Sequence, residues 1–299
     1  MPIPSFNLLS PTEWADYQLI DCGNFEKLER FGSYVVARPE PQAIWDKSLD
    51  NRTWQQTAAH FHKDTQNTEK GFWEVKKPAI QANWPMTYPL PNQMLRFKLS
   101  LSSFKHVGVF PEQACNWDYI FEVLQHSPPV NPPPKVLNLF AYTGGASLAA
   151  KAAGADVLHV DAVKPVISWA RENMELSHLQ DIRWVVEDAL TFVRREVKRQ
   201  NKYQGIILDP PTYGRGPKGE KWLLEDMIND LLKQCALLAD ERNFFLIINL
   251  YAIGFSALVL DNLINQLFKN PTNLSIGELY LNDQSNKRLP LGVFARFHR

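Results

Sequence analysis

Glycines, prolines and carboxylates follow four successive apolar runs in the second half of this 299-residue chain. The runs end, in order, in Thr143-Gly144-Gly145, Asp161, Asp188 and Asp209-Pro-Pro-Thr-Tyr213. Glycines let the backbone approach a ligand closely, and a helix that starts there offers unpaired N–H groups to an anion. Asp161 and Asp188 can accept hydrogen bonds from ribose hydroxyls and from an adenine amine. Taken together, the four positions predict a nucleoside site.

The last of these positions predicts how a flat, amine-bearing substrate is held. Pro210 and Pro211 remove two backbone N–H donors and fix φ, so the carbonyl groups around them are stiff and cannot pair sideways in a sheet. Asp209 and the Pro210 carbonyl can accept from an amine or a ring N–H. Tyr213 can stack on a base, which contributes about 1–3 kcal/mol per base.

Each position also has a simpler structural interpretation. A lone acidic residue at a strand end is often a helix N-cap. The loop cations Arg215, Lys218 and Lys221 fit phosphate contacts and, equally, a polar surface. Glycines followed by an acidic residue also occur in dinucleotide-binding dehydrogenases, but "TGGASLAA" is not G-x-G-x-x-G, and Asp-Pro-Pro has no role in hydride transfer. Four such strand ends in order favour the nucleoside site.

Strands must alternate with helices to bring these positions together. Five apolar runs predict strands: 135–142, 156–163, 181–188, 203–211 and 243–250. Five segments predict helices: 146–154, 164–176, 189–200, 220–239 and 256–268. Two closing strands follow at 275–282 and 292–298. The fold class is therefore α/β, a doubly wound, mostly parallel seven-stranded sheet with an antiparallel last strand, which binds ligands beyond the carboxyl ends of its strands.

The front of the chain has a different character, and five prolines within 126–135 separate it from the rest. Alternating residues predict strands within 17–40, 70–77 and 94–104, whereas 53–66 predicts a helix. Pro111 and apolar residues at helical spacing predict a helix over 111–125. We expect a β-rich N-terminal module over 1–105, a candidate for substrate recognition, and a second domain over 106–299 with its core sheet from about 135.

The composition restricts the class of protein. The hydrophobic fraction of 45% and the charged fraction of 21% are ordinary for a soluble globular chain. The 32 basic residues balance 32 acidic ones, which argues against extensive non-specific nucleic-acid binding and leaves room for local basic patches at 194–202, 214–221 and 295–299. We expect no membrane span, no signal peptide and a cytoplasmic location. The spacing of Cys22, Cys115 and Cys235 predicts neither a metal site nor a disulfide framework.

The order of the motifs resembles class I S-adenosylmethionine-dependent methyltransferases, through "VLNLFAYTGG", "HVDAV", "VVEDAL" and "ILDPPTYGRG". More narrowly, it is similar to the bacterial group that includes the ribosomal RNA large-subunit base methyltransferases. The resemblance is strong over 135–250. It extends to "YQLIDCGNFEKLERFGSYVVARPEPQAIW" and "FKHVGVFPEQACNWDYI", which look like a branch with a β-rich amino-terminal module. Phe140 and Tyr142 replace two glycines of many methyltransferases, as in the RNA-modifying relatives.

The resemblance implies S-adenosylmethionine as cofactor, with its methionine end on Thr143-Gly144-Gly145, its ribose on Asp161 and its adenine on Asp188. It implies that the segment from Phe110 to Gln113 lies beside the cofactor. The implied cofactor-binding residues are Gln113, Phe140, Tyr142, Thr143, Gly144, Gly145, Asp161, Ala162, Asp188, Ala189 and Asp209. The implied catalytic residues are Asp209, Pro210, Pro211 and Tyr213. The implied substrate-binding residues are Thr212, Tyr213, Arg215 and Lys218.

The expected function is methyl transfer to a nitrogen of an RNA base, with RNA held through a local basic patch. Attack from carbon 5 of a pyrimidine generally needs a cysteine. None stands near 209–213 or in 249–256, and Cys115 is interpreted as structural. Thr212 resembles the Asp-Pro-Pro-Thr-aromatic form of relatives that methylate guanine. Two alternatives remain: a methyltransferase of small molecules or proteins, which the neutral charge suits, and a nucleoside-binding protein without catalysis, against which the intact Asp209–Tyr213 element counts.

Overall fold

The computed structural model describes residues 6–11, 14–64, 71–76, 80–102, 105–126, 131–251, 254–269 and 271–299. The chain forms two compact units. The large unit comprises Met1–Leu9, Gln113–Leu279 and Gly292–Arg299, and the small unit comprises Ser10–Glu112 and Tyr280–Leu291. The sequence predicted a boundary between 105 and 106, whereas this division falls between Glu112 and Gln113 and adds a C-terminal segment to the small unit.

An eight-stranded sheet is central to the large unit. Its strands are ordered β1 (Phe6–Leu9), β16 (Ser275–Asn282), β17 (Arg288–His298), β15 (Phe245–Leu250), β12 (Gly205–Leu208), β9 (Lys135–Leu139), β10 (Asp156–Asp161) and β11 (Arg183–Val186). The run from β15 to β11 is parallel, and β17 pairs antiparallel with β15. The predicted fold class is confirmed. β1 is an additional edge strand, parallel to β16, whose four residues are half-buried or exposed and which was not predicted from the sequence.

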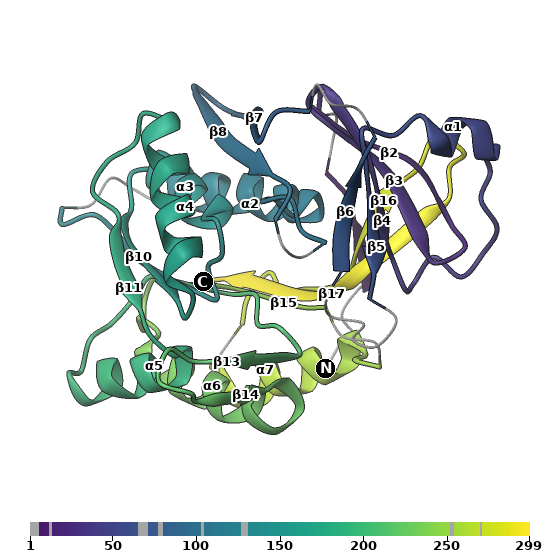
Figure 1. Ribbon diagram of the computed structural model, residues 1–299. Helices are drawn as coiled ribbons and strands as arrows, with labels where there is room; N and C mark the ends of the chain where they lie inside the picture. Colours follow the sequence, from purple (N-terminus) through teal and green to yellow (C-terminus); the bar gives the residue numbers. More distant parts are fainter. Residues whose placement is uncertain are drawn as a thin grey trace. The chain divides into compact units, whose positions relative to one another are not determined.

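Helices cover both faces of this sheet, with α2, α3 and α4 on one side and α5, α6 and α7 on the other (Figure 1). Their bounds are α2 (Ala114–His126), α3 (Gly145–Ala152), α4 (Lys164–Leu176), α5 (Ala189–Lys198), α6 (Leu224–Leu238) and α7 (Ala257–Leu267). The central strands β12 and β15 are buried along their whole length, because side chains of both faces meet a helical layer. A short 3₁₀ helix, Pro111–Gln113, precedes α2. Residues 127–130 of the predicted proline-rich linker lie outside the described residues.

A five-stranded sheet dominates the small unit. Its order is β2 (Tyr17–Gly23), β3 (Glu26–Phe31), β4 (Tyr34–Pro39), β5 (Ala59–Lys63) and β6 (Gly71–Val75). A separate hairpin consists of β7 (Asn83–Leu90) and β8 (Gln93–Ser100). The described part of the small unit is therefore β-rich, as the sequence predicted.

Two segments of the small unit differ from the sequence prediction. The helix expected over 53–66 is wrong over most of its length: α1 (Asn51–Gln55) ends early, and 59–63 form β5. The strand β7 was not predicted, because its two prolines are atypical of a strand. Both prolines lie at exposed positions of a two-stranded sheet, where a missing N–H donor is tolerated.

The tip of the β16–β17 hairpin completes the small unit. Lys287 Nζ donates to Asp21 Oδ1 at 3.0 Å and to the Cys22 carbonyl at 2.6 Å. Asp21 is fully buried and also accepts from Trp54 Nε1 at 3.0 Å and from the Leu49 N–H at 2.9 Å. These hydrogen bonds lower the pKa of the Asp21 carboxyl against the opposing effect of burial. The first and last parts of the chain therefore share one interior.

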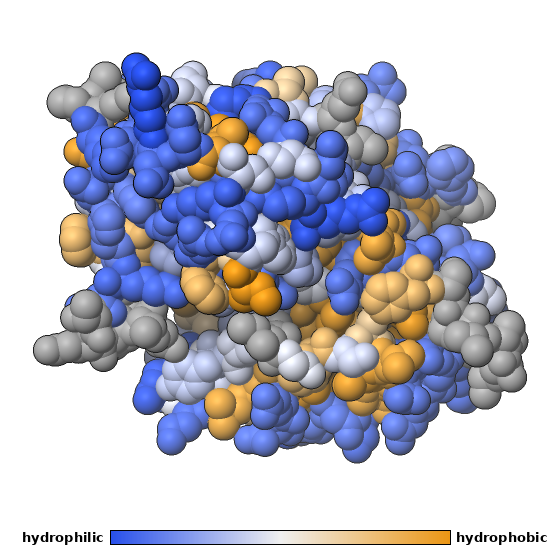
Figure 2. Space-filling view, turned by 90° about the vertical axis from the view of Figure 1, so that its right-hand side faces the viewer, coloured by the Kyte–Doolittle hydropathy of each residue, from blue (hydrophilic) through white to orange (hydrophobic). Residues whose placement is uncertain are grey.

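The surface is mixed in character. On the face drawn in Figure 2, hydrophilic residues surround several separate groups of hydrophobic ones, which is ordinary for a folded protein. Across the described residues, no helix has both the length and the apolar composition needed to cross a membrane.

Candidate functional site

The four predicted positions follow four neighbouring strands of the large unit. β12, β9, β10 and β11 are adjacent and parallel, with Leu208 opposite Leu139 and Asp161 opposite Val186. Because carboxyl ends of parallel strands meet at one edge of a sheet, the residues that follow these strands lie along the same edge.

The loop after β9 has an unusual backbone. Phe140 and Tyr142 have φ values of 55° and 48°, and Gly144 has a φ of 95°. Bulky residues in the left-handed region carry a local strain of about 1–3 kcal/mol each, and such strain persists only where surrounding contacts hold it. Here the two aromatic residues adopt a left-handed backbone that glycine adopts more readily.

Three hydrogen bonds to two neighbouring elements hold this loop. The Tyr142 N–H donates to Asp161 Oδ2 at 2.9 Å, and the Ala141 N–H donates to the Val160 carbonyl at 3.2 Å. The buried Asn173 amide donates to the Thr143 carbonyl at 3.0 Å. The loop is therefore fixed by β10 and α4.

Asp161 organises this edge of the sheet. Besides Tyr142, the Val163 N–H donates to its Oδ1 at 2.9 Å. Burial raises the pKa of the Asp161 carboxyl, and the backbone hydrogen bonds oppose that shift. Both carboxylate oxygens thus bind backbone, although each oxygen has room for a second donor. Ala162, which stands between Asp161 and Val163 in the chain, is partly buried.

Gly144 and Gly145, which follow β9, are each needed for a different physical reason. Gly144 needs its left-handed backbone, and a Cβ there would lie 3.3 Å from Ala170 Cβ. At Gly145 a Cβ would lie 2.6 Å from Trp117 Cζ2, because the indole of α2 packs directly on this residue. The sequence predicted that both glycines admit a ligand, whereas the close neighbour of Gly145 is a side chain of the protein itself.

Asp188 is the N-cap of α5. Its Oδ1 accepts from the Thr191 N–H at 2.8 Å, and Ala189 is the buried first residue of the helix. The N-cap interpretation considered from the sequence is therefore correct as geometry. The capping hydrogen bond uses Asp188 Oδ1 and leaves Oδ2 able to accept from a ligand.

Asp209 receives a hydrogen bond from an amide side chain of α2's leading turn. Gln113 Nε2 donates to Asp209 Oδ2 at 3.3 Å. The orientation of this amide is fixed, because Gln113 Oε1 accepts from both Asn116 Nδ2 and Asn249 Nδ2 at 3.0 Å. Asn116 Nδ2 also lies 3.1 Å from Asn249 Oδ1. The three amides form one network that holds the donor toward Asp209.

Of the three residues in this amide network, only Gln113 was predicted from the sequence. Asn249 is a polar residue inside the apolar run of β15, and that position was the available sequence signal. The buried Asn116 lies on the inner face of α2 among apolar residues. Both residues become recognisable only when β15 and α2 are placed together.

The prolines are fixed by an indole. Trp222 Nε1 donates to the Pro211 carbonyl at 2.7 Å, and its ring lies 4.8 Å from that of Phe140. Pro210 is buried, whereas Pro211 and Thr212 are exposed. The loops after β9 and β12 are therefore coupled through Trp222.

A small hairpin follows the prolines directly. β13 (Tyr213–Arg215) pairs antiparallel with β14 (Lys221–Leu223), and Arg215 stands opposite Lys221. Tyr213 and Leu223 are also opposite each other, with exposed fractions of 43% and 44%. The other face of the hairpin is anchored by the buried Trp222. The sequence predicted β14 as the start of a helix over 220–239, but α6 begins at Leu224.

Lys218 lies in the turn of this hairpin. Its backbone N–H donates to Glu220 Oε2 at 2.9 Å, and its side chain is exposed. The carboxylate of Glu220 therefore lies close to the cations predicted to bind substrate.

Comparison with known proteins identifies a matching family and a similar solved structure. A sequence model of the S-adenosylmethionine-dependent methyltransferase family matches residues 35–269. A solved S-adenosylmethionine-dependent methyltransferase from Agrobacterium tumefaciens is 36% identical, with a TM-score of 0.88 over 97% of this chain and 93% of its own.

Two curated relatives carry the name ribosomal RNA large subunit methyltransferase K/L. The protein of Shewanella frigidimarina is 30% identical over 146 residues, which are 46% of this chain and 19% of the relative. The protein of Hahella chejuensis is 34% identical over 151 residues, or 48% of this chain and 20% of the relative. This chain thus spans about one fifth of the length of these relatives. With the family model matching most of its length, the chain belongs to the S-adenosylmethionine-dependent methyltransferase family.

Proposed function

We propose that this methyltransferase transfers the methyl group to a nitrogen of an RNA base. One observation carries the proposal: Asp209-Pro-Pro-Thr-Tyr213 continues directly into a hairpin whose exposed face combines an aromatic ring, an aliphatic side chain and two cations. A base and its phosphate need that combination of stacking surface and positive charge.

The strand-edge residues fit S-adenosylmethionine. Gly144 leaves the start of α3 without a side-chain cap, so the helix N-terminus suits the carboxylate of the methionine end. The half-buried Asp161 can accept from ribose hydroxyls, and Asp188 Oδ2 from the adenine amine. When bound, the cofactor supplies an electrophilic methyl group on a sulfonium.

The residues of this chain act mainly by alignment. Methyl transfer from a sulfonium disperses charge, so no oxyanion hole is required. Well-oriented reacting groups reach effective molarities of roughly 10⁵–10⁸ M. Asp209 and the Pro210 carbonyl accept from the substrate amine and turn its lone pair toward the methyl group. The Gln113 amide holds the Asp209 carboxylate in place for this task.

The hairpin favours a nucleic acid over a small molecule. Like charges directly opposite each other in an antiparallel pair are destabilising, and Arg215 stands opposite Lys221. A phosphate bound by both side chains offsets that repulsion. The names of the curated relatives support the same acceptor class, since both refer to ribosomal RNA.

The weak nucleophilicity of the buried cysteine thiols favours a nitrogen, rather than carbon 5 of a pyrimidine, as the methyl acceptor. Burial raises the pKa of the Cys235 thiol, and burial together with Asp283 raises that of Cys22 to about 12. A thiol with a raised pKa is a poor nucleophile. Cys115 lies on α2, where its carbonyl accepts from Arg296 Nη1 at 3.0 Å. A nitrogen lone pair needs no such covalent help.

Cys115→Ser is expected to leave kcat for RNA methylation unchanged, because the proposed reaction has no thiol adduct. The rate is measured with labelled cofactor, and Cys235→Ser serves as a matched control for the loss of a thiol. An inactive Cys115→Ser enzyme that still folds and binds cofactor would replace the nitrogen acceptor by carbon 5.

The double variant Arg215→Gln/Lys221→Gln is expected to weaken RNA binding and to flatten its salt dependence. Two lost phosphate contacts reduce the slope of log K against log salt by about 1.4 for a single strand. Binding is measured by fluorescence anisotropy at several salt concentrations. The exposed pair Lys135→Gln/Arg242→Gln, near the amino ends of β9 and β15, makes the same charge change outside the three candidate basic patches. If both variants show the same slope of log K against log salt, the hairpin is not part of the RNA-binding surface.

The acceptor is identified by mass spectrometry of nucleosides from total RNA of cells with and without the gene. We expect one methylated nucleoside to be lost, and to return with the wild-type gene but not with an Asp209→Ala gene. Unchanged RNA, together with cofactor turnover on a protein or small molecule, would overturn the RNA acceptor.

A further inference from the structure

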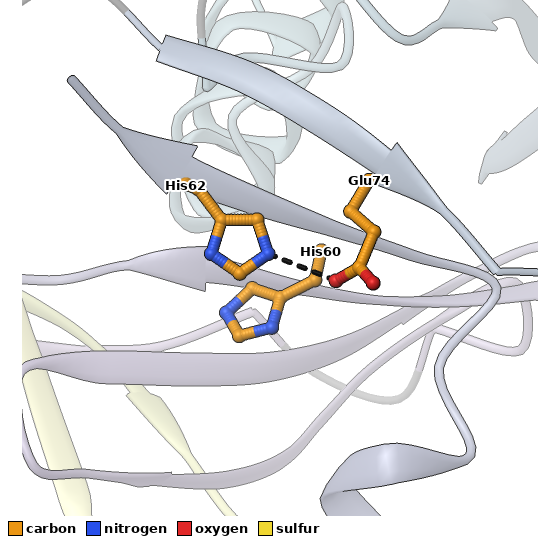
Figure 3. A group of neighbouring side chains, drawn as sticks. All are labelled: His60, His62 and Glu74. Atoms are coloured by element: carbon orange, nitrogen blue, oxygen red, sulfur yellow. Dashed lines mark hydrogen bonds and ion pairs between the residues drawn. The ribbon is translucent and has the colours of Figure 1, made fainter.

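Two histidines and a glutamate converge on the five-stranded sheet of the small unit. His60 and His62 are two residues apart on β5, so both side chains lie on the same face. Glu74 on β6 stands opposite His60 in the register. One ligand atom from each of the three residues lies within 4.8 Å of the others, and Figure 3 shows their side chains gathered together.

A second carboxylate lies beside this group. Glu26 Oε1, from β3, is 2.6 Å from His60 Nε2, and Glu74 Oε2 is 3.0 Å from His62 Nε2. The two imidazole rings are 4.3 Å apart between centroids. Two imidazoles and two carboxylates thus form one cluster, which we call the His60 cluster.

Ion pairing alone is a poor explanation of the His60 cluster. Two histidine–carboxylate ion pairs would require both imidazoles to be cationic at this ring separation, and like charges repel at such range. With neutral imidazoles, the carboxylates are offset by Lys47, 2.6 Å from Glu26, and by Lys76, 3.9 Å from Glu74. A divalent cation held by His60, His62 and Glu74 would bind the Glu74 carboxylate and use the imidazoles in their neutral form, with Glu26 accepting a hydrogen bond from His60.

We propose that the His60 cluster binds a divalent transition-metal ion of the zinc type. Imidazole nitrogen favours zinc, nickel and copper over magnesium and calcium, which prefer oxygen ligands. Bonds of about 2.0–2.2 Å place two ligand atoms of a tetrahedral zinc ion about 3.3 Å apart. Small rotations of the half-buried histidines and of the exposed Glu74 would bring the three ligand atoms to that spacing. His60, His62 and Glu74 supply the ligands, and Glu26, which is hydrogen-bonded to His60, orients that imidazole.

Such an ion would cross-link two neighbouring strands. β5 contributes both histidines and β6 contributes Glu74. β6 is the edge strand of this sheet, so the ion would secure the strand that has a neighbour on one side only. The site is independent of methyl transfer, and its test needs no methylation assay.

The test is calorimetric titration of the untagged full-length protein with ZnCl₂ after removal of metals by a chelator. We expect one zinc ion per chain, a zinc-dependent rise in Tm, and no heat with MgCl₂. His62→Ala and Glu74→Gln are each expected to weaken zinc binding by at least about 10–100-fold, the loss seen even for residues that only support a ligand. Co²⁺ is expected to show the visible absorption of a tetrahedral site.

Matched controls separate the His60 cluster from adventitious imidazole binding. His126→Ala and His178→Asn remove exposed histidines of the large unit and should leave zinc affinity unchanged. Glu74→Gln keeps the size of the side chain, and circular dichroism confirms that each variant is folded. Zinc binding that survives in folded His60→Gln/His62→Gln protein, or a wild type that binds no stoichiometric zinc, would overturn the proposal.

Discussion

Asp209→Asn is expected to lower kcat by about 10²–10⁴-fold, the range for a group that handles a substrate proton or hydrogen bond in the transition state. The substitution keeps the shape of the side chain but replaces one acceptor oxygen by a donor. That amide would face both the Gln113 amide and the substrate amine, so the lone pair is no longer turned toward the methyl group.

Cofactor affinity should stay close to that of the wild type, because the proposed main role of Asp209 is toward the acceptor. The two quantities are measured separately, with labelled methyl transfer for the rate and calorimetry for the cofactor. Asp181→Asn makes the same chemical change at an exposed position and should be neutral. A normal rate for Asp209→Asn would show that its carboxylate plays no part in the reaction.

Asp161→Ala is expected to weaken binding of S-adenosylmethionine by about 100-fold or more. A hydrogen bond to a charged group contributes about 1.5–3 kcal/mol, and the variant loses the proposed bonds to ribose. It also releases the Tyr142 and Val163 N–H groups, so the strained loop loses a main restraint. We therefore expect a loss of folding stability of about 1–3 kcal/mol, since a hydrogen bond to a charged group contributes about 1.5–3 kcal/mol and the two released N–H groups are only partly buried or exposed.

Calorimetry measures the cofactor affinity, and urea denaturation measures the free energy of unfolding. Asp156→Ala is the matched control, because Asp156 begins the same strand and pairs with the exposed Arg183 at 3.0 Å. Surface ion pairs contribute little, about 0–1 kcal/mol. Unchanged cofactor affinity in folded Asp161→Ala protein would remove Asp161 from the cofactor site.

The strand-edge part of the site was accessible from sequence because it depends on local order. Parallel strands that alternate with helices bring their carboxyl ends together, so Asp161, Asp188 and Asp209 could be placed along one edge without coordinates. Periodicity also identified the helices of the large unit and the strands of its main sheet other than β1, but not β13 and β14. The N-cap role of Asp188 was likewise available from the residue type alone.

The remaining contacts could not be predicted for two reasons. Some depend on tertiary packing, and others lie in a segment whose periodicity was assigned to a helix instead of a strand. Asn116 and Asn249 meet through the packing of α2 on β15, 133 positions apart in the chain. His60 and His62 were assigned to a helix, in which residues two apart point about 200° apart around the axis. In the strand that forms instead, they share a face. The hairpin of β13 and β14 was not predicted, because the glycine- and proline-rich composition of this segment is typical of a loop.

The discontinuous small unit has a consequence for synthesis on the ribosome. The fully buried Asp21 and the Cys22 carbonyl receive their lysine partner from the β16–β17 tip, which is translated long after β2. At about 5–20 residues per second, Leu291 follows Glu112 by roughly 10–35 s. During that interval the nascent β-rich segment has an interior carboxylate that is hydrogen-bonded to Leu49 and Trp54 but still lacks its lysine counter-charge.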